Sequence, residues 1–101
     1  MRVIVFFDLP TETTEDRREY RSFRKFLIRN GFIMLQESVY SKIALNQTAA
    51  NGVVAMLKRN RPSGGIVQLL VITEKQYAGM EYIVGEFKSE IIDSEERLIV
   101  L

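Results

Sequence analysis

Apolar and polar positions follow one another along the chain in blocks that predict strands and helices in alternation. Residues 2–8 form a continuous apolar run, which is typical of a central strand. Residues 32–44 are extended, but the alternation fails around Gln36-Glu37-Ser38, which predicts a bulge or a break into two strands. Ile66 to Thr73 is another buried strand, and it follows a turn at Pro62-Ser63-Gly64-Gly65.

Two segments carry apolar residues at helical spacing. The first covers about residues 13–30, with Thr11, Thr13 and Thr14 as candidate N-caps and Gly31 as a C-terminal stop. The second covers about residues 48–60, capped within Asn46-Gln47-Thr48. The side chains predicted to face the sheet are Tyr20, Phe23, Phe26 and Leu27 in the first helix and Ala50, Val53, Val54 and Leu57 in the second.

The order strand, helix, strand, strand, helix, strand predicts an α+β, ferredoxin-like βαββαβ domain with an antiparallel sheet and both helices on one face. We expect one domain over residues 1–101, with its core in about 1–73. A chain of 101 residues has little area to spare, and the second sheet face needs a cover. The fold therefore predicts a homodimer.

The C-terminal segment, about residues 74–101, is expected to make dimer or partner contacts. Glu74 to Met80 is a polar turn with some helix character, and Tyr82-Ile83-Val84 is a candidate strand. The apolar end, Arg97-Leu98-Ile99-Val100-Leu101, is a candidate extra strand that would bind a partner by pairing with another chain's sheet edge.

Composition removes several classes of function. The chain has no cysteine and no histidine, which excludes disulfides, thiolate zinc sites and most histidine-based ribonuclease and zinc-hydrolase schemes. It has no apolar run of about 18 residues, and Met1-Arg2 leads directly into a strand, so we expect no membrane association and a cytoplasmic protein.

The net charge of +1 conceals an asymmetry. Residues 1–62 hold eleven Lys or Arg and six acids, a net +5, whereas residues 63–101 hold three and seven, a net −4. Such a split suggests a polyanion-binding face. The candidate nucleic-acid-binding residues are Arg17, Arg21 and Arg24, spaced i, i+4, i+7, with Arg18 and Lys25 beside them and Lys58, Arg59 and Arg61 after the second helix.

Each basic cluster has a structural alternative. Some of the helix arginines could pair with Glu12, Glu15 and Glu19 and only solubilise the helix. The cations at 58–61 could only stabilise the C-terminal end of the second helix by interacting with its dipole. Arginine favours function, because its planar fork matches phosphate oxygens.

Asp8 is the sharpest single candidate for catalysis and metal binding. It ends an apolar strand and precedes Leu9-Pro10, so we expect a fixed, partly desolvated carboxylate. One aspartate cannot complete a magnesium site, but two copies across a two-fold axis could share a mostly water-ligated Mg²⁺ ion. The alternative is that Asp8 caps the turn at Thr11 or Thr13. Ser38, Tyr40 and Ser41 could contact phosphate or water.

The ordered set of motifs resembles one family, the second of the two core CRISPR-associated adaptation proteins, in its type II form. The motifs are Phe6-Phe7-Asp8-Leu9-Pro10, Arg17-Arg18 with Tyr20, Phe23-Arg24-Lys25-Phe26-Leu27, Gly31-Phe32, Gln36, Ser38-Val39-Tyr40, Thr73-Glu74-Lys75-Gln76-Tyr77 and Glu95-Glu96-Arg97-Leu98. Lys42, where many relatives place arginine, is assigned to nucleic acid as well.

The resemblance implies a ferredoxin-like homodimer that bridges two dimers of the CRISPR-associated integrase. That complex holds double-stranded protospacer DNA and inserts it into the repeat array, which is spacer acquisition in antiviral defence. Family members are also described as magnesium-dependent endoribonucleases or DNA nucleases, with the aspartate matching Asp8 as metal ligand. The hypotheses are thus a DNA-binding adaptor, a metal-dependent phosphodiesterase and, disfavoured by the arginine line, a regulatory dimer that binds a small molecule.

Overall fold

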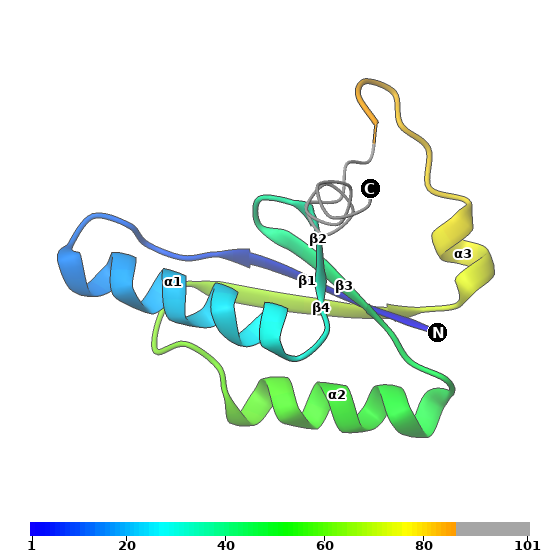
Figure 1. The fold of residues 1–101 in the computed structure, drawn as a ribbon, viewed down its shortest axis with the longest axis horizontal. Helices are drawn as coiled ribbons and strands as arrows, with labels where there is room; N and C mark the ends of the chain where they lie inside the picture. Colours follow the sequence, from blue (N-terminus) through cyan, green and yellow to red (C-terminus); the bar gives the residue numbers. More distant parts are fainter. Residues whose placement is uncertain (87–101) are drawn as a thin grey trace, which may run out of the picture.

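The computed structural model describes residues 1–86 of the chain, and they adopt the predicted α+β, ferredoxin-like arrangement (Figure 1). The two long helices cover one face of a four-stranded antiparallel sheet. In chain order the elements are β1 (Arg2–Asp8), α1 (Thr14–Arg29), β2 (Ile33–Gln36), β3 (Val39–Ile43), α2 (Gln47–Arg59), β4 (Ile66–Ile72) and α3 (Glu74–Ala78). The predicted break at residues 36–38 is confirmed as the turn between β2 and β3, with a register shift between Met34 and Gln36.

The strand order is β2-β3-β1-β4, so β1 lies in the centre and β4 at an edge. Both neighbours run antiparallel to β1, with Val5 opposite Tyr40 of β3 and Leu69 of β4. Asp8, the last residue of β1, pairs with Ile66, the first residue of β4. The sheet register therefore places Asp8 where the turn before β4 meets the end of β1.

Local sequence determines both ends of α1. Thr13 is the N-cap, and it forms a capping box with Asp16 in which Asp16 N–H donates to the Thr13 hydroxyl at 2.9 Å. At the other end Gly31 has φ +89°, the left-handed conformation that lets the chain leave the helix after Asn30. At the start of α2, the side chain of the N-cap residue Asn46 accepts a hydrogen bond from Ala49 N–H at 2.8 Å.

The core lies between the sheet and the two helices. Alternate residues of β1, Val3, Val5 and Phe7, face the helices and are buried. The predicted helix stripes are confirmed except at Val54, which is half-buried and does not belong to the core cluster. Phe23 and Leu27 of α1 and Ala50 and Leu57 of α2 are buried, and Tyr20, Phe26 and Val53 pack partly buried against them.

The opposite face of the sheet, which we call the open face, carries Ile4, Phe6 and Asp8 of β1 with their partners on β3 and β4. Several of its apolar side chains are exposed, among them Phe6, Ile66 and Leu70. Met80 and Tyr82 line a hollow of about 250 Å³ on this face together with Ile4, Phe6 and Val39. Residues 74–86 thus cover only part of the open face.

The short helix α3 is fastened near the N-terminus of the chain (Figure 1). Arg2 Nε donates to the Glu74 carboxylate at 2.9 Å, and the Arg2 guanidinium lies 3.9 Å from the centre of the Tyr77 ring. The terminal ammonium of Met1 is 3.8 Å from the same carboxylate. These contacts determine where the chain turns onto the open face.

The strand predicted at Tyr82-Ile83-Val84 is wrong for the single chain. The segment is irregular, and Ile83 and Val84 are at least 90% exposed. A strand needs a neighbour with which to exchange backbone hydrogen bonds, and this segment has none among residues 1–86. The predicted partner-binding strand Arg97–Leu101 lies outside the described residues. Over residues 1–86, no helix combines the length and the apolar character that crossing a membrane requires.

Candidate functional site: Asp8 and the basic face of α1

Asp8 projects from the end of β1 on the open face, beside Ile66. Its side chain is exposed, so the expected partial desolvation is wrong for the single chain, because no described element covers this end of the face. The expected capping role is also not observed: Thr13 is paired with Asp16 instead. Within residues 1–86 the Asp8 carboxylate makes no hydrogen bond or ion pair, which leaves its oxygens available to a ligand.

The strand end that carries Asp8 is anchored by aromatic packing. The ring of Phe7 lies 5.2 Å from that of Phe23 and 5.9 Å from that of Tyr20, both edge-on, and it stacks on Tyr40 at 5.7 Å. Such ring pairs stabilise beyond their buried area. The backbone at residue 7 is therefore held rigidly from the helix side, one residue before the candidate acid.

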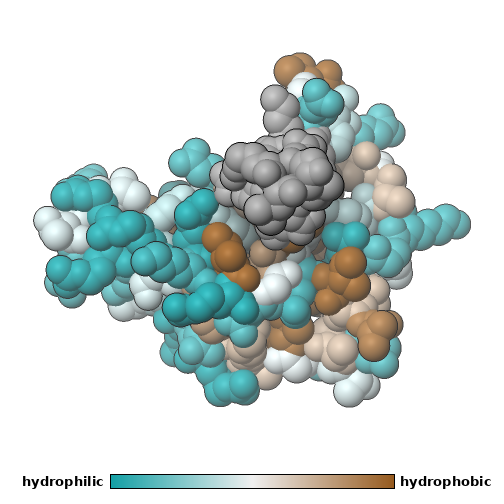
Figure 2. Space-filling model, in the orientation of Figure 1, coloured by the Kyte–Doolittle hydropathy of each residue, from teal (hydrophilic) through white to brown (hydrophobic). Residues whose placement is uncertain are grey.

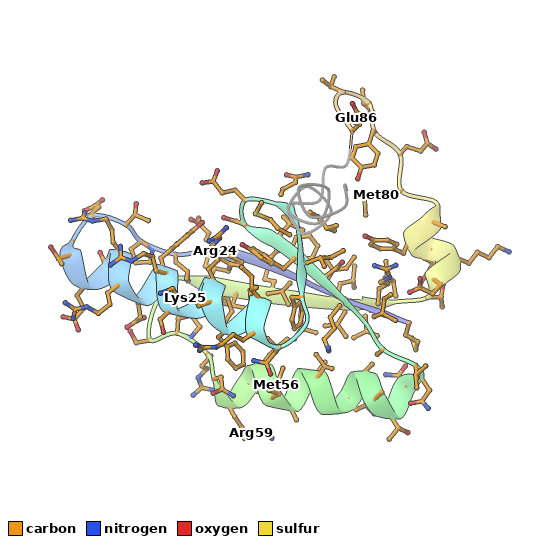
Figure 3. The ribbon with its side chains drawn as sticks, viewed as in Figure 1. Arg24, Lys25, Met56, Arg59, Met80 and Glu86 are labelled. Carbon is orange, nitrogen blue, oxygen red and sulfur yellow. The ribbon has the colours of Figure 1, made fainter. Side chains whose placement is uncertain are left out.

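The arginines of α1 do not form one uniform row. Arg17 Nη1 donates to the carbonyl oxygens of Thr11 at 3.1 Å and Glu12 at 3.0 Å, so it closes the loop that precedes the helix. Arg24 is half-buried and points from α1 toward the sheet, where its Nε donates to the Tyr40 hydroxyl at 2.9 Å (Figure 3). Two of the three arginines in the predicted line thus make structural contacts.

The exposed cations of α1 that have no partner are Arg18, Arg21, Lys25 and Arg29. Within the described part of the chain, none of the four makes a hydrogen bond or ion pair. The alternative in which Glu12, Glu15 and Glu19 neutralise the helix arginines is not observed, because none of these acids forms an ion pair with them in residues 1–86. Figure 2 shows hydrophilic side chains gathered over the N-terminal half of α1.

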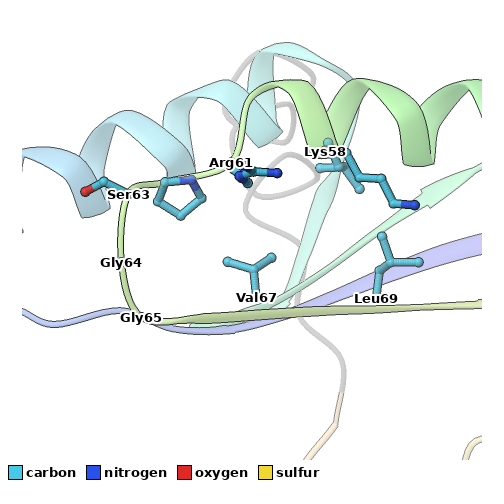
Figure 4. Close-up of a pocket in the computed structure, with 9 residues that line it drawn as sticks. Lys58, Arg61, Ser63, Gly64, Gly65, Val67 and Leu69 are labelled. Atoms are coloured by element: carbon cyan, nitrogen blue, oxygen red, sulfur yellow. The ribbon is translucent and has the colours of Figure 1, made fainter.

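The second basic cluster lies at the end of α2. Lys58, Arg59 and Arg61 are exposed, and Arg59 projects away from the helix layer (Figure 3). Lys58 and Arg61 line a cavity of about 390 Å³ beside the edge strand β4 (Figure 4). Lys58 and Arg59 also occupy the last turn of the helix, where cations stabilise the dipole.

Lys42 is not close to Asp8 along the sheet. It pairs with Val3, near the opposite end of β1. A side chain at Gly31 would meet the Lys42 ammonium, because a Cβ there would lie 2.6 Å from Nζ. Lys42 therefore sits over the C-terminal end of α1, where a cation is favourable.

The hydroxyl groups expected near the bulge are mostly inaccessible. Tyr40 and Ser41 are completely buried in the single chain, so the prediction that they contact phosphate is wrong for these two residues, whereas Ser38 is half-buried. The Tyr40 hydroxyl accepts a hydrogen bond from Arg24 of α1. Ser41 Oγ faces the open side of the sheet and has no hydrogen-bond partner within residues 1–86.

Sequence reasoning missed the contact between Glu19 and Ser63. The Glu19 carboxylate accepts from the Ser63 backbone N–H at 2.9 Å, and its oxygens lie 2.7 and 2.8 Å from the Ser63 hydroxyl. The two residues are 44 positions apart, and no local pattern joins them. Glu19 therefore binds the turn before β4 and does not form an ion pair with an arginine within residues 1–86.

Within the described residues, no group of three or more His, Cys, Asp or Glu side chains could hold a metal ion. Over residues 1–86, one chain therefore offers the accessible Asp8 carboxylate on the open face and an unpaired basic surface on α1, which covers the other face of the sheet. This arrangement can attract a polyanion, and it can supply one ligand of a shared cation.

Comparison with known proteins identifies relatives over the whole chain. The family model for CRISPR associated protein Cas2 matches residues 1–80. A CRISPR-associated endoribonuclease Cas2 from Treponema denticola is 55% identical over 101 residues, which is 100% of both chains. Proteins with the same name from Streptococcus mutans UA159 and Ligilactobacillus salivarius are 52% and 46% identical over 101 residues, covering all of this chain and 93% and 100% of theirs.

Proposed function

This chain belongs to the CRISPR-associated Cas2 family, and from that premise we propose that it is a homodimeric adaptor that binds double-stranded DNA. In this role it bridges dimers of the CRISPR-associated integrase during protospacer capture and spacer integration, in the cytoplasm of a prokaryotic cell. The observation that carries the proposal is the set of exposed cations on α1 that have no partner within residues 1–86, which includes Arg18, Arg21 and Lys25.

A helix of 16 residues is about 24 Å long, so its cations can follow several phosphates of one duplex backbone. Charges arranged in this way bind the backbone and do not read bases. Doubling the helix by a two-fold axis would extend the positive track, which suits a duplex held across a dimer.

The open face supports self-association. Phe6, Ile66 and Leu70 are exposed apolar residues on one surface, and monomers seldom leave such a surface uncovered. A second copy stacked on this face would bury these side chains. Asp8 lies on the same face, beside Ile66, so the dimer would bring two carboxylates toward one axis.

The integrase is expected to contact the C-terminal segment, about residues 74–101. This part of the sequence belongs to the acidic half of the chain and ends on the apolar run 97–101. Contacts between that run and the edge of another sheet would use backbone hydrogen bonds. Arg97, Leu98, Ile99, Val100 and Leu101 remain the proposed partner-binding residues.

A second candidate function is magnesium-dependent cleavage of phosphodiester bonds in RNA or DNA. It is favoured by one observation, the exposed carboxylate of Asp8, which has no partner within residues 1–86. The relatives' names describe endoribonucleases. Asp8 would hold Mg²⁺ together with water and the Asp8 of a second copy, because no group of three or more possible metal ligands occurs among residues 1–86 of one chain. A bound Mg²⁺ would polarise a phosphate oxygen and lower the pKa of its water.

A protospacer integration assay with the cognate integrase separates the two functions. Wild type is compared with Asp8→Ala and with omission of the protein, after sedimentation has measured the oligomeric state of both forms. The adaptor proposal expects normal integration by Asp8→Ala and none without the protein. If Asp8→Ala remains dimeric and binds DNA but does not integrate, the acid belongs to the mechanism and the nuclease function takes precedence.

A further inference from the structure

The turn Pro62–Gly65 joins α2 to the edge strand β4 (Figure 4). Glu19 of α1 forms hydrogen bonds with this turn. Glu19 accepts the Ser63 N–H at 2.9 Å, and the Ser63 hydroxyl lies 2.7 and 2.8 Å from its two oxygens. Hydrogen bonds to an ionised carboxylate are about twice as strong as neutral ones. Glu19 therefore fixes the position of the turn relative to α1.

The same turn packs directly on the backbone at Asp8. Gly65 has φ +79°, and a Cβ built there would lie 2.6 Å from the Asp8 carbonyl oxygen and 2.8 Å from Leu9 Cδ2. No other residue fits this contact, because a real Cβ does not approach backbone so closely. The next residue, Ile66, is the strand partner of Asp8. The turn and the end of β1 thus form one rigid contact.

We propose that Glu19 is a positioning residue for Asp8. It acts through Ser63 and Gly65: the carboxylate holds the turn, and the turn holds the backbone from which Asp8 projects. Asp8 has no side-chain partner of its own within residues 1–86, so the backbone is what sets the position and direction of the Cα–Cβ bond that carries its carboxylate. The inference rests on the proposed function only in taking Asp8 as the acid that meets a divalent cation.

A competing explanation is electrostatic. Glu19 lies among Arg17, Arg18 and Arg21 on α1, so removing its charge also changes the local potential. Glu15 is a suitable control, because it is an exposed acid on the same helix with no side-chain contact in the described structure. Glu15→Ala changes the net charge by the same amount and leaves the turn untouched.

The experiment uses the full chain in five forms besides wild type: Glu19→Ala, Ser63→Ala, Ser63→Thr, Glu15→Ala and Asp8→Asn. Mn²⁺ affinity is measured by electron paramagnetic resonance, and amide exchange is measured at Asp8 and Ile66 by NMR. Residues that orient a metal ligand typically change metal affinity about 10–100-fold, and a two-step contact should fall near the lower value. We expect about a tenfold loss of Mn²⁺ affinity and faster exchange at both amides in Glu19→Ala. Ser63→Ala should change both properties in the same direction but by less, because the Ser63 backbone N–H still donates to Glu19. Ser63→Thr keeps the hydroxyl and should restore both properties.

The outcomes distinguish this inference from the proposed function. If Asp8→Asn binds Mn²⁺ like wild type, the cation role of Asp8 fails, and the amide exchange in Glu19→Ala still decides whether Glu19 positions that backbone. If Asp8→Asn loses Mn²⁺ but Glu19→Ala keeps wild-type affinity and exchange, the positioning role is overturned. An equal loss in Glu15→Ala would also overturn it. Should Glu19→Ala fail to fold, Glu19→Gln, which keeps one acceptor oxygen, replaces it with an expected intermediate affinity.

Discussion

Arg21 and Arg24 lie one turn apart on α1, and replacing each with alanine should damage different properties of the protein. Arg21 is exposed, and it makes no side-chain contact within the described part of the chain. Arg24 is half-buried and donates to the hydroxyl of Tyr40, a side chain that is 0% exposed. We therefore expect Arg21→Ala to weaken DNA binding and Arg24→Ala to weaken the fold.

The magnitudes follow from these environments. Arg24→Ala removes a hydrogen bond to a buried hydroxyl, which costs about 1–3 kcal/mol of unfolding free energy. In a domain of this size that lowers Tm by about 4–8 °C for each kcal/mol. Arg21→Ala is a surface change and should stay within about 0.5 kcal/mol of wild type.

The effect of Arg21 should appear in the salt dependence of DNA binding. Each phosphate contact contributes about 0.9 to the slope of log K against log salt, so a dimer that loses two contacts loses about 1.8. A fourfold rise in salt would then cost wild type about tenfold more affinity than it costs the variant. Thermal melts and fluorescence anisotropy with a labelled duplex at four salt concentrations measure both properties on the same samples.

A double-mutant cycle tests whether the hydrogen bond between Arg24 and Tyr40 stabilises the fold. If the Arg24 contact with Tyr40 carries the stability loss, Arg24→Ala should cost little in a Tyr40→Phe background. An Arg21→Ala variant with the wild-type salt slope would refute the assignment of this side chain to phosphate. An Arg24→Ala variant that melts like wild type but has a reduced slope would show that the two roles are reversed.

Three further substitutions test the fold and the chain's path onto the open face. Leu27→Ala removes a completely buried side chain and should cost about 2–5 kcal/mol in urea unfolding, whereas a cost below about 1 kcal/mol would contradict the core assignment. Gly31→Ala forces alanine to φ +89° and should cost about 1–2 kcal/mol by the same measurement, whereas wild-type stability in this variant would contradict the need for glycine at this position. Glu74→Ala removes the exposed contact with Arg2, so we expect it to lower the global free energy of unfolding by at most about 1 kcal/mol. Amide exchange at residues 74–78 should become faster, and unchanged exchange there would refute the role of this contact.

Much of the fold could be predicted because its signals are local. The apolar run of β1, the stripe with Phe23 and Leu27, and the Thr13 cap each involve residues within a few positions of one another. Period, cap and turn chemistry therefore determined the order of the elements, and that order restricts an antiparallel sheet with helices on one face to few topologies.

The candidate site was predicted less completely. Asp8 was found because a lone acid at a strand end is visible in the sequence, but its exposure depends on which elements cover the open face. The spacing of Arg17, Arg21 and Arg24 predicted a continuous row, and it could not reveal that Arg24 turns toward Tyr40.

The amino-acid sequence by itself determined the order of strands and helices from β1 to β4, the α+β class, the surplus of cations in residues 1–62 and the family resemblance. Only the tertiary structure decided which polar groups meet. Arg24 reaches Tyr40 across 16 positions, Glu19 reaches Ser63 across 44, and Arg2 reaches Glu74 across 72. The physical reason is that a hydrogen bond depends on distances of about 3 Å between side chains, and packing sets those distances once the sheet register and the helix positions are established.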